Sequence, residues 1–341
     1  MLFDCDPAGC RATVAGPRKS TPLTLAAAPC PDHSASPGAP TEIPSEPRRK
    51  NWSPALFHQV DTRNADAVQH EVAAVHAALF PRGDRGFVAR AFGWARDCFE
   101  GRNPGYLPID ARYHDLEHTL QGTLAIAQLL QGRQAAGAQP PVTAGEFQLG
   151  VLAALFHDTG YLKRSDDTEG TGAKYTAVHV ERSAAFAGEF LGARGFSGDE
   201  VSAIQNMIRC TGVQADVRVL RFRNETERAI GYALGTADLL GQMAADDYPE
   251  KLLALYDEFA EAAKFPGAPL PAGLRFESAD ALMRSTRGFW ENFVLPKIND
   301  DLGGLHVFLN DPYPDGPNSF VQRIERNLQR VQRELAAKPA A

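Results

Sequence analysis

The chain has 341 residues, of which 44% are hydrophobic and 23% are charged, and its formal net charge at pH 7 is −7. This composition is typical of a globular protein with a sizeable core. It gives no sign of the Lys/Arg-rich faces that bind nucleic acid or an anionic membrane, so we expect neither a nucleic acid polymer nor a membrane as partner.

Residues 1–54 are rich in Pro, Ala, Ser, Gly and Arg and show neither a strand nor a helix period. Such a segment buries too little apolar surface to offset chain entropy, so we predict a disordered leader. It lacks the basic start and continuous apolar stretch of a signal peptide, and no run approaches the roughly 18 apolar residues of a membrane span. A cytoplasmic location is therefore expected.

The five cysteines are an odd number and have no CxxC spacing. Neither a disulfide framework nor a thiolate metal site is supported by this pattern. We expect the thiols to be reduced.

Apolar residues recur at helical spacing from residue 65 onward. Stripes that begin at Val68, Phe87 and Leu116 predict three helices, and a fourth ends at residues 157–160, where Gly160 is a plausible stop. Further helical patterns cover about 178–192, 199–210, 225–242, 247–263 and 279–300, and a last helix begins near residue 319. No alternating strand pattern and no internal repeat appear. We therefore predict a single all-α domain over residues 55–341.

Two short segments within this domain carry side chains that suit a metal site, YHDLEH at 113–118 and LFHDTG at 155–160. His114 and His118 are four residues apart, so they share one face of a helix. Adjacent residues on a helix point about 100 degrees apart, so His157 and Asp158 could reach one metal ion only at a helix end.

Asp238 lies inside an otherwise apolar helical pattern. A carboxylate there is costly to bury unless a cation or hydrogen-bond donors compensate it. Together His118, His157, Asp158 and Asp238 provide two neutral nitrogens and two carboxylates, a set that suits Mg, Mn, Fe or Zn without selecting one of them. The sequence therefore predicts a divalent metal centre, with its core at about residues 110–300.

These residues resemble the HD superfamily of metal-dependent phosphohydrolases, whose pattern is H…HD…D on a helical scaffold. The closer resemblance is to its class I cyclic-nucleotide phosphodiesterase-like branch. The segments that carry it are YHDLEH at 113–118, AALFHD at 153–158, ADL at 237–239 and GFWENFVLP at 288–296.

The resemblance implies a hydrolase or phosphodiesterase that cleaves a small nucleotide-like phosphate ester. His118, His157, Asp158 and Asp238 would bind two divalent ions, with Asp158 bridging them. His114 would be the general acid that protonates the leaving oxygen, while an activated water attacks phosphorus in line.

The resemblance also implies residues that bind the substrate. His179 lies where the superfamily often places a histidine near the second metal or the phosphate, and Phe289 matches a residue that stacks on the base. Thr286 stands where the branch has a purine-reading glutamine, and Asp115 replaces its asparagine. Residues 159–162, TGYL, lack its third histidine. The chemistry is retained by this match, and the base specificity is not.

Two other functions fit the same residues. A di-iron oxygenase on an HD fold would use nearly the same ligands with further histidines, of which His179 is the clear extra one. A non-catalytic nucleotide-binding module would keep the fold but predicts an incomplete ligand set. For the hydrolase, the expected partner is a small phosphorylated substrate, which could be a nucleotide. The apolar stripe of the last helix suits either packing or a homodimer seam.

Overall fold

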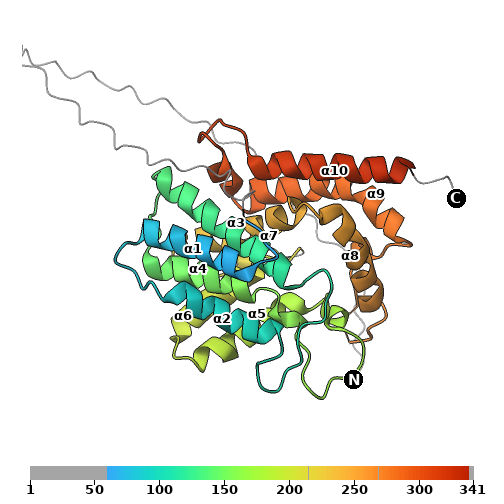
Figure 1. Ribbon diagram of the computed structural model, residues 1–341, viewed down its shortest axis with the longest axis horizontal. Helices are drawn as coiled ribbons and strands as arrows, with labels where there is room; N and C mark the ends of the chain where they lie inside the picture. Colours follow the sequence, from blue (N-terminus) through green and yellow to red (C-terminus); the bar gives the residue numbers. More distant parts are fainter. Residues whose placement is uncertain (1–59, 214, 268, 338–341) are drawn as a thin grey trace, which may run out of the picture. The chain divides into compact units, whose positions relative to one another are not determined.

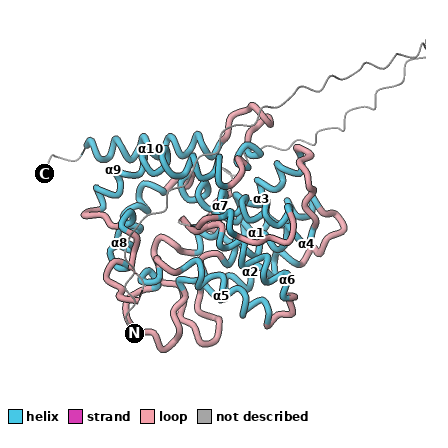
Figure 2. The backbone as a smooth tube through the Cα atoms, turned by 180° about the vertical axis from the view of Figure 1, so that it is seen from behind, coloured by secondary structure: helices cyan, strands magenta, loops and turns pink. Residues whose placement is uncertain are grey.

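The computed structural model describes residues 60–213, 215–267 and 269–337. The predicted leader, residues 1–54, lies outside the described residues. Within the described ranges the chain is helical and contains no strand, as Figure 2 shows. The isolated bridges Tyr106–Arg164 and Asn310–Asn318 are the β-type pairings there. The prediction of an all-α fold is confirmed.

The helices follow the predicted ranges closely. None of them, within the described residues, combines the length and the apolar character that a membrane-crossing helix needs. Two short 3₁₀ turns, η2 (Thr159–Tyr161) and η3 (Gly172–Tyr175), follow α4, and π-helical turns at Trp290–Val294 and Lys297–Asp301 continue α9. The α-helices are α1 (Ala65–Leu79), α2 (Phe87–Phe99), α3 (Leu116–Ala135), α4 (Ala144–Phe156), α5 (His179–Gly192), α6 (Gly198–Arg209), α7 (Glu225–Met243), α8 (Tyr248–Ala262), α9 (Ala279–Phe289) and α10 (Ser319–Ala337).

Side-chain caps determine where several helices begin. Thr143 forms a capping box with Glu146 at the start of α4. Asp115 caps α3, because its Oδ1 accepts a hydrogen bond from the backbone N–H of His118 at 2.9 Å. The aspartate that departs from the phosphodiesterase pattern therefore fixes the first turn of the helix that carries His118.

Helices α3 and α7 pack against each other at the centre of the helical unit (Figure 1). Every residue of α3 from His118 to Leu130 is buried, because α1, α4 and α7 surround it. Gly241 of α7 faces Gln121 of α3, and a Cβ on this glycine would lie 3.1 Å from the Gln121 backbone. The small residue permits a close approach, and one turn away this approach brings Asp238 to His118.

Helices α8, α9 and α10 pack against one another, and α9 and α10 lie side by side in both views (Figures 1 and 2). The predicted apolar stripe of α10 is buried within the chain, with Phe320 and Ile324 at 0% exposure. This stripe packs on α7, α8 and α9. The packing interpretation of the stripe therefore accounts for its burial.

The two cysteines in the described residues, Cys98 and Cys210, are free and buried. Burial raises the pKa of both thiols to about 12, so neither provides a thiolate at neutral pH. Cys5, Cys10 and Cys30 lie outside the described residues.

The prediction that Gly160 stops the fourth helix is wrong. Helix α4 ends at Phe156 with His157 as its C-cap, and Gly160 lies in η2 without a left-handed φ. Glycine is needed there for a different reason, which is the close approach of α5. A Cβ at this position would lie 2.0 Å from the backbone oxygen of His179.

Gly160→Ala is expected to lower the free energy of unfolding by about 1–3 kcal/mol, because the added methyl forces α5 away from η2. Gly93→Ala is the matched control, since Gly93 is exposed in α2 and a Cβ there meets nothing within 4 Å. This control is expected to stabilise the fold by about 0.5–1 kcal/mol. Urea unfolding followed by circular dichroism measures both changes. A Gly160→Ala protein as stable as the wild type would contradict the packing argument.

Candidate metal centre

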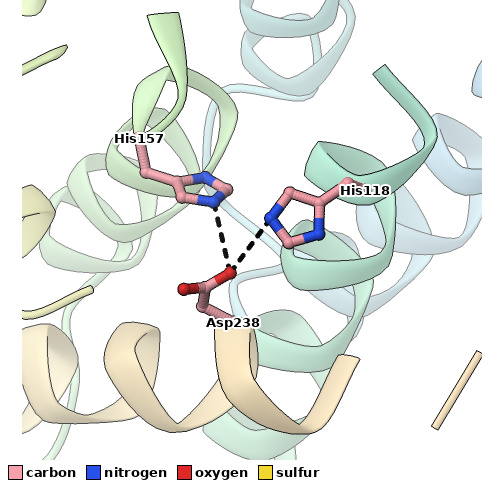
Figure 3. A group of neighbouring side chains, drawn as sticks. All are labelled: His118, His157 and Asp238. Carbon is pink, nitrogen blue, oxygen red and sulfur yellow. Dashed lines mark ion pairs between the residues drawn. The ribbon is translucent and has the colours of Figure 1, made fainter. Parts of the chain in front are cut away.

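His118 and His157 converge on the carboxylates of Asp158 and Asp238. Nε2 of His118 lies 3.1 Å from Asp158 Oδ2 and 3.2 Å from Asp238 Oδ1. Nε2 of His157 lies 3.3 Å and 3.4 Å from the same two oxygens. The ligand atoms of His118, His157 and Asp238 all lie within 4.8 Å of one another, and Figure 3 shows both imidazoles directed at the Asp238 carboxylate. The structure thus brings the four predicted ligands into one cluster.

The cluster is buried, and three of its polar atoms lack a hydrogen-bond partner. These atoms are Nε2 of His157, Oδ2 of Asp158 and Oδ1 of Asp238. Leaving a buried polar group unsatisfied costs about 1–3 kcal/mol, and more for a charged group. A cation would satisfy a nitrogen lone pair and carboxylate oxygens together, so these residues fit a metal ion.

Backbone carbonyl groups select the tautomers of two histidines. Nδ1 of His157 lies 2.7 Å from the Ala154 oxygen, and Nδ1 of His179 lies 2.6 Å from the Thr176 oxygen. Since a carbonyl oxygen only accepts, each Nδ1 carries the hydrogen and each Nε2 keeps its lone pair. Nε2 of His179 is 3.9 Å from Oδ1 of Asp158, so it faces the second oxygen of that carboxylate.

The cluster attracts positive charge. Burial disfavours the charged form of His118, but its interactions with Asp158 and Asp238 outweigh burial and raise its pKa to about 10. Burial also disfavours a charged His157, and the same carboxylates raise its pKa. Although burial opposes their ionisation, the neighbouring histidines hold the pKa values of both carboxyl groups below the usual range. Both carboxylates are therefore ionised at neutral pH, and protons and a divalent cation would compete for this site.

His157 and Asp158 reach the same cluster because α4 ends at Phe156, directly before them. His157, the C-cap of α4, still has helical backbone dihedral angles. The backbone of Asp158 departs from the helical conformation, with φ −110° and ψ 9°. This geometry confirms the prediction that the adjacent pair converges at a helix end.

Helix α5 holds the turn that follows Asp158. The Arg182 guanidinium donates to the backbone oxygens of Gly160 and Leu162, each at 2.7 Å. The Gly160 N–H donates to Ser183 Oγ at 2.8 Å. These three bonds fix the backbone directly after the ligand pair.

His114 lies beside the cluster and pairs with Glu258 of α8. Its Nδ1 is 2.6 Å from Glu258 Oε2, and Glu258 Oε1 accepts from the backbone N–H of Tyr113 at 2.6 Å. Burial opposes ionisation of Glu258, but the charge and hydrogen bond of His114 and the Tyr113 N–H lower its pKa. The carboxylate is therefore ionised at neutral pH. It fixes the hydrogen of His114 on Nδ1 and leaves Nε2 for a ligand.

Glu258 is a residue that the sequence analysis missed. It lies on the apolar face of α8, among Leu252, Leu255 and Phe259, and is 3% exposed. A carboxylate within an apolar stripe is the same signal that singles out Asp238, so the pattern could have identified it.

Tyr161 is a second residue that the sequence analysis did not single out. Its ring stacks on those of both His114 and His179, with centroid distances of 4.5 Å and 4.9 Å and interplanar angles of 16° and 23°, and the two imidazole centroids lie 5.8 Å apart. These contacts fix the planes of both imidazoles. The stretch 159–162, which lacks the branch's third histidine, therefore contributes an aromatic ring that contacts both histidines.

A cavity of about 430 Å³ opens on the cluster. His157 lies behind its wall at 1% exposure. Thr286 and Phe289 reach the cavity from α9. The predicted site residues that line it are His114, His118, Asp158, His179, Asp238, Thr286 and Phe289.

The fold and the site define a class, an all-helical protein whose buried His/Asp cluster could hold a metal ion at a cavity. Residues 106–312, more than half of the chain, match the model of the Npun_R2479-like family, and the chain belongs to this family. No curated protein matches the sequence. The matched range includes every predicted site residue, from His114 to Phe289.

Proposed function

We propose that the protein is a metal-dependent phosphoric ester hydrolase of the HD type. The observation that carries the proposal is the convergence of two imidazole nitrogens and two ionised carboxylates, from His118, His157, Asp158 and Asp238, beside the His114–Glu258 pair. Hydrolysis of a phosphate ester needs positive charge near the phosphoryl oxygens and a proton donor for the leaving oxygen. The candidate site provides residues for both.

Two divalent ions are proposed, with Asp158 bridging them. Support comes from the two oxygens of this carboxylate, since Oδ2 contacts His118 and His157 while Oδ1 faces His179 at 3.9 Å. When bound, divalent ions would supply positive charge to a phosphoryl group and lower the pKa of an attacking water.

Positive charge for the phosphate would have to come from these ions. Among the described residues that line the cavity, none is Lys or Arg. A phosphate group placed there would meet the carboxylates of the cluster without a lysine or arginine from the described wall. Metal dependence is therefore part of the proposal.

His114 would protonate the leaving oxygen through Nε2. Glu258 holds Nδ1–H at 2.6 Å, so it orients the ring and stabilises the imidazolium from which the proton leaves. Stacking on Tyr161 keeps the ring in this plane.

Removal of metal is expected to abolish hydrolysis, because the proposed ions would activate the attacking water and no Lys or Arg of the described wall could replace their charge. Protein treated with a chelator should lose activity on a panel of cyclic nucleotides, nucleoside monophosphates and triphosphates, and generic phosphate esters. Addition of Mn, Mg, Fe or Zn should restore it, and elemental analysis should show the metal returning with the activity. Full activity in protein stripped to well below one metal ion per chain would contradict the proposal.

A di-iron oxygenase is the second candidate, because His179 adds a third histidine next to Asp158. It predicts a tightly bound, oxygen-sensitive iron pair with a visible absorption band and no ester hydrolysis. Metal analysis and absorption spectroscopy of the purified protein separate it from the hydrolase.

A further inference from the structure

We propose that the cavity accepts a phosphate ester with one phosphate and an apolar or aromatic organic group, and that it does not read a nucleobase through hydrogen bonds. This inference rests on the proposed function, because the metal cluster would hold the phosphate. The described lining of the cavity has two chemically different parts, called its two ends below. The first is the His/Asp cluster, and the second is the set of side chains that α8 and α9 contribute.

The second end is apolar. Leu255 and Phe259 line it from α8, and Leu282 and Phe289 line it from α9. Phe259 stacks on Phe276, which also lines the cavity, with ring centroids 6.1 Å apart. An organic group bound there would gain affinity by leaving water, without a directional partner.

The Ser and Thr hydroxyl groups of this wall donate to backbone oxygens rather than to the cavity. Each lies in or beside a helix or turn and bonds to a carbonyl three or four residues earlier, a pattern that uses its single hydrogen. The pairs are Thr176 with Ala173 at 2.7 Å, Thr211 with Ile208 at 2.8 Å, Ser285 with Leu282 at 2.7 Å and Thr286 with Leu282 at 3.1 Å. These four hydroxyl groups therefore offer a base acceptor oxygens and no donor, and the other hydroxyl groups of the described lining are the phenols of Tyr113, Tyr161 and Tyr248.

Gln242, the one amide side chain among the described lining residues, is also engaged. Its Oε1 accepts from the Tyr113 hydroxyl at 2.7 Å, and its Nε2 donates to the Asp238 backbone oxygen at 3.1 Å. An amide recognises a base by donating and accepting together, and here one of its two N–H groups and one of its two oxygen lone pairs are already used. Tyr248 adds a phenol whose pKa is raised by burial, so it brings no charge.

A second or third phosphate would lack a partner on this wall. The described lining residues include no Lys or Arg, and the carboxylates of Asp158 and Asp238 would repel further negative charge. Nucleoside di- and triphosphates are therefore poor ligands, and the ester that fits has a single phosphate at the metal end.

The inference is tested with three p-nitrophenyl phosphodiesters that share one leaving group and differ in the second alcohol, which is methanol, phenol or the 5′-hydroxyl of thymidine. With Mn-loaded protein, kcat/KM for the phenyl ester is expected to exceed that for the methyl ester by about 10- to 100-fold, as burial of one aromatic ring implies. The thymidine ester is not expected to exceed the phenyl ester. A thymidine ester cleaved faster than the phenyl ester would overturn the inference.

Substitutions in α8 and α9 test whether the side chains that line the cavity cause the preference for the phenyl ester over the methyl ester. Leu255→Ala and Phe289→Ala should each lower the phenyl-to-methyl ratio by at least about threefold, since both side chains line the apolar end. Leu253→Ala is the matched control, because Leu253 lies two residues away on α8, is 50% exposed and does not line the cavity. An unchanged ratio in the two lining variants would overturn the inference.

The affinity of ligands that cannot be hydrolysed tests this inference independently of the proposed function. Titration calorimetry with methylphosphonate, phenylphosphonate and a nucleoside phosphonate measures affinity for ligands that have no ester bond. If phenylphosphonate binds best while no ester is hydrolysed, the inference stands and the proposed function fails. If esters are hydrolysed while the nucleoside phosphonate binds best, or methyl and phenyl bind equally, the inference fails and the proposed function stands.

Discussion

Asp158→Asn is expected to lower kcat/KM for phosphate esters by about 10³-fold or more, because several kcal/mol of transition-state stabilisation depend on the bound cation. The substitution conserves volume and removes the charge of a carboxylate that contacts His118 and His157 through Oδ2 and faces His179 through Oδ1. No other single side chain among the described residues reaches all three histidines in this way.

The same variant should lose stabilisation of the fold by metal. A ligand that binds only the folded state at 100 times its Kd stabilises by about 2.7 kcal/mol, so Mn should raise the Tm of the wild type and leave that of Asp158→Asn nearly unchanged. Asp166→Asn is the control, since Asp166 is exposed in the following loop. Wild-type activity together with a metal-dependent Tm in Asp158→Asn would rule out the proposed centre.

Glu258→Gln should lower kcat by about 10²-fold for esters with poor, alkyl leaving groups, within the range of general acid catalysis. Glu258 is a positioning residue that acts through His114, and the neutral amide cannot stabilise the imidazolium as the carboxylate does. The lowered pKa of Glu258 means that this pair is intact at neutral pH and is lost only as the pH falls through the acidic range.

The way in which the effect of Glu258→Gln varies with the leaving group of the ester distinguishes a role in proton transfer from a structural role of Glu258. Esters of p-nitrophenol need little protonation of the leaving oxygen, so Glu258→Gln should affect them far less than alkyl esters. Asp257→Asn is the matched control, because it removes one negative charge from the neighbouring, exposed position on α8. An equal loss for both kinds of ester would mean that Glu258 supports the fold and not proton transfer.

The helices and three of the candidate ligands could be predicted because their signals are local. Helical periodicity requires only that apolar residues recur along one face, and the observed α7 and α8 lie within one residue of the predicted ranges at each end. His118, His157 and Asp158 stand out by spacing alone. Asp238 is far from these residues in the sequence, but it can be recognised because a carboxylate within an apolar helical pattern is costly to bury.

The partners of His114, the proposed general acid, could not be found by spacing. His114 and Glu258 are 144 residues apart, and their contact depends on how α8 packs beside the start of α3. The stacking of Tyr161 on both His114 and His179 likewise needs η2 and α5 to be in place. Gly160 illustrates the same limit, because its role is set by the backbone of α5 rather than by the helix that it follows.

By itself, the sequence determined an all-helical protein with four candidate metal ligands. Both helix periodicity and a charged residue within an apolar pattern can be recognised from residues that are close together in the sequence. Only the tertiary structure decided what surrounds those ligands. The hydrogen bonds that occupy Gln242, Ser285 and Thr286, and the burial that joins Glu258 to His114, depend on distances between helices. These distances follow from side-chain packing across the whole core, which no local pattern specifies.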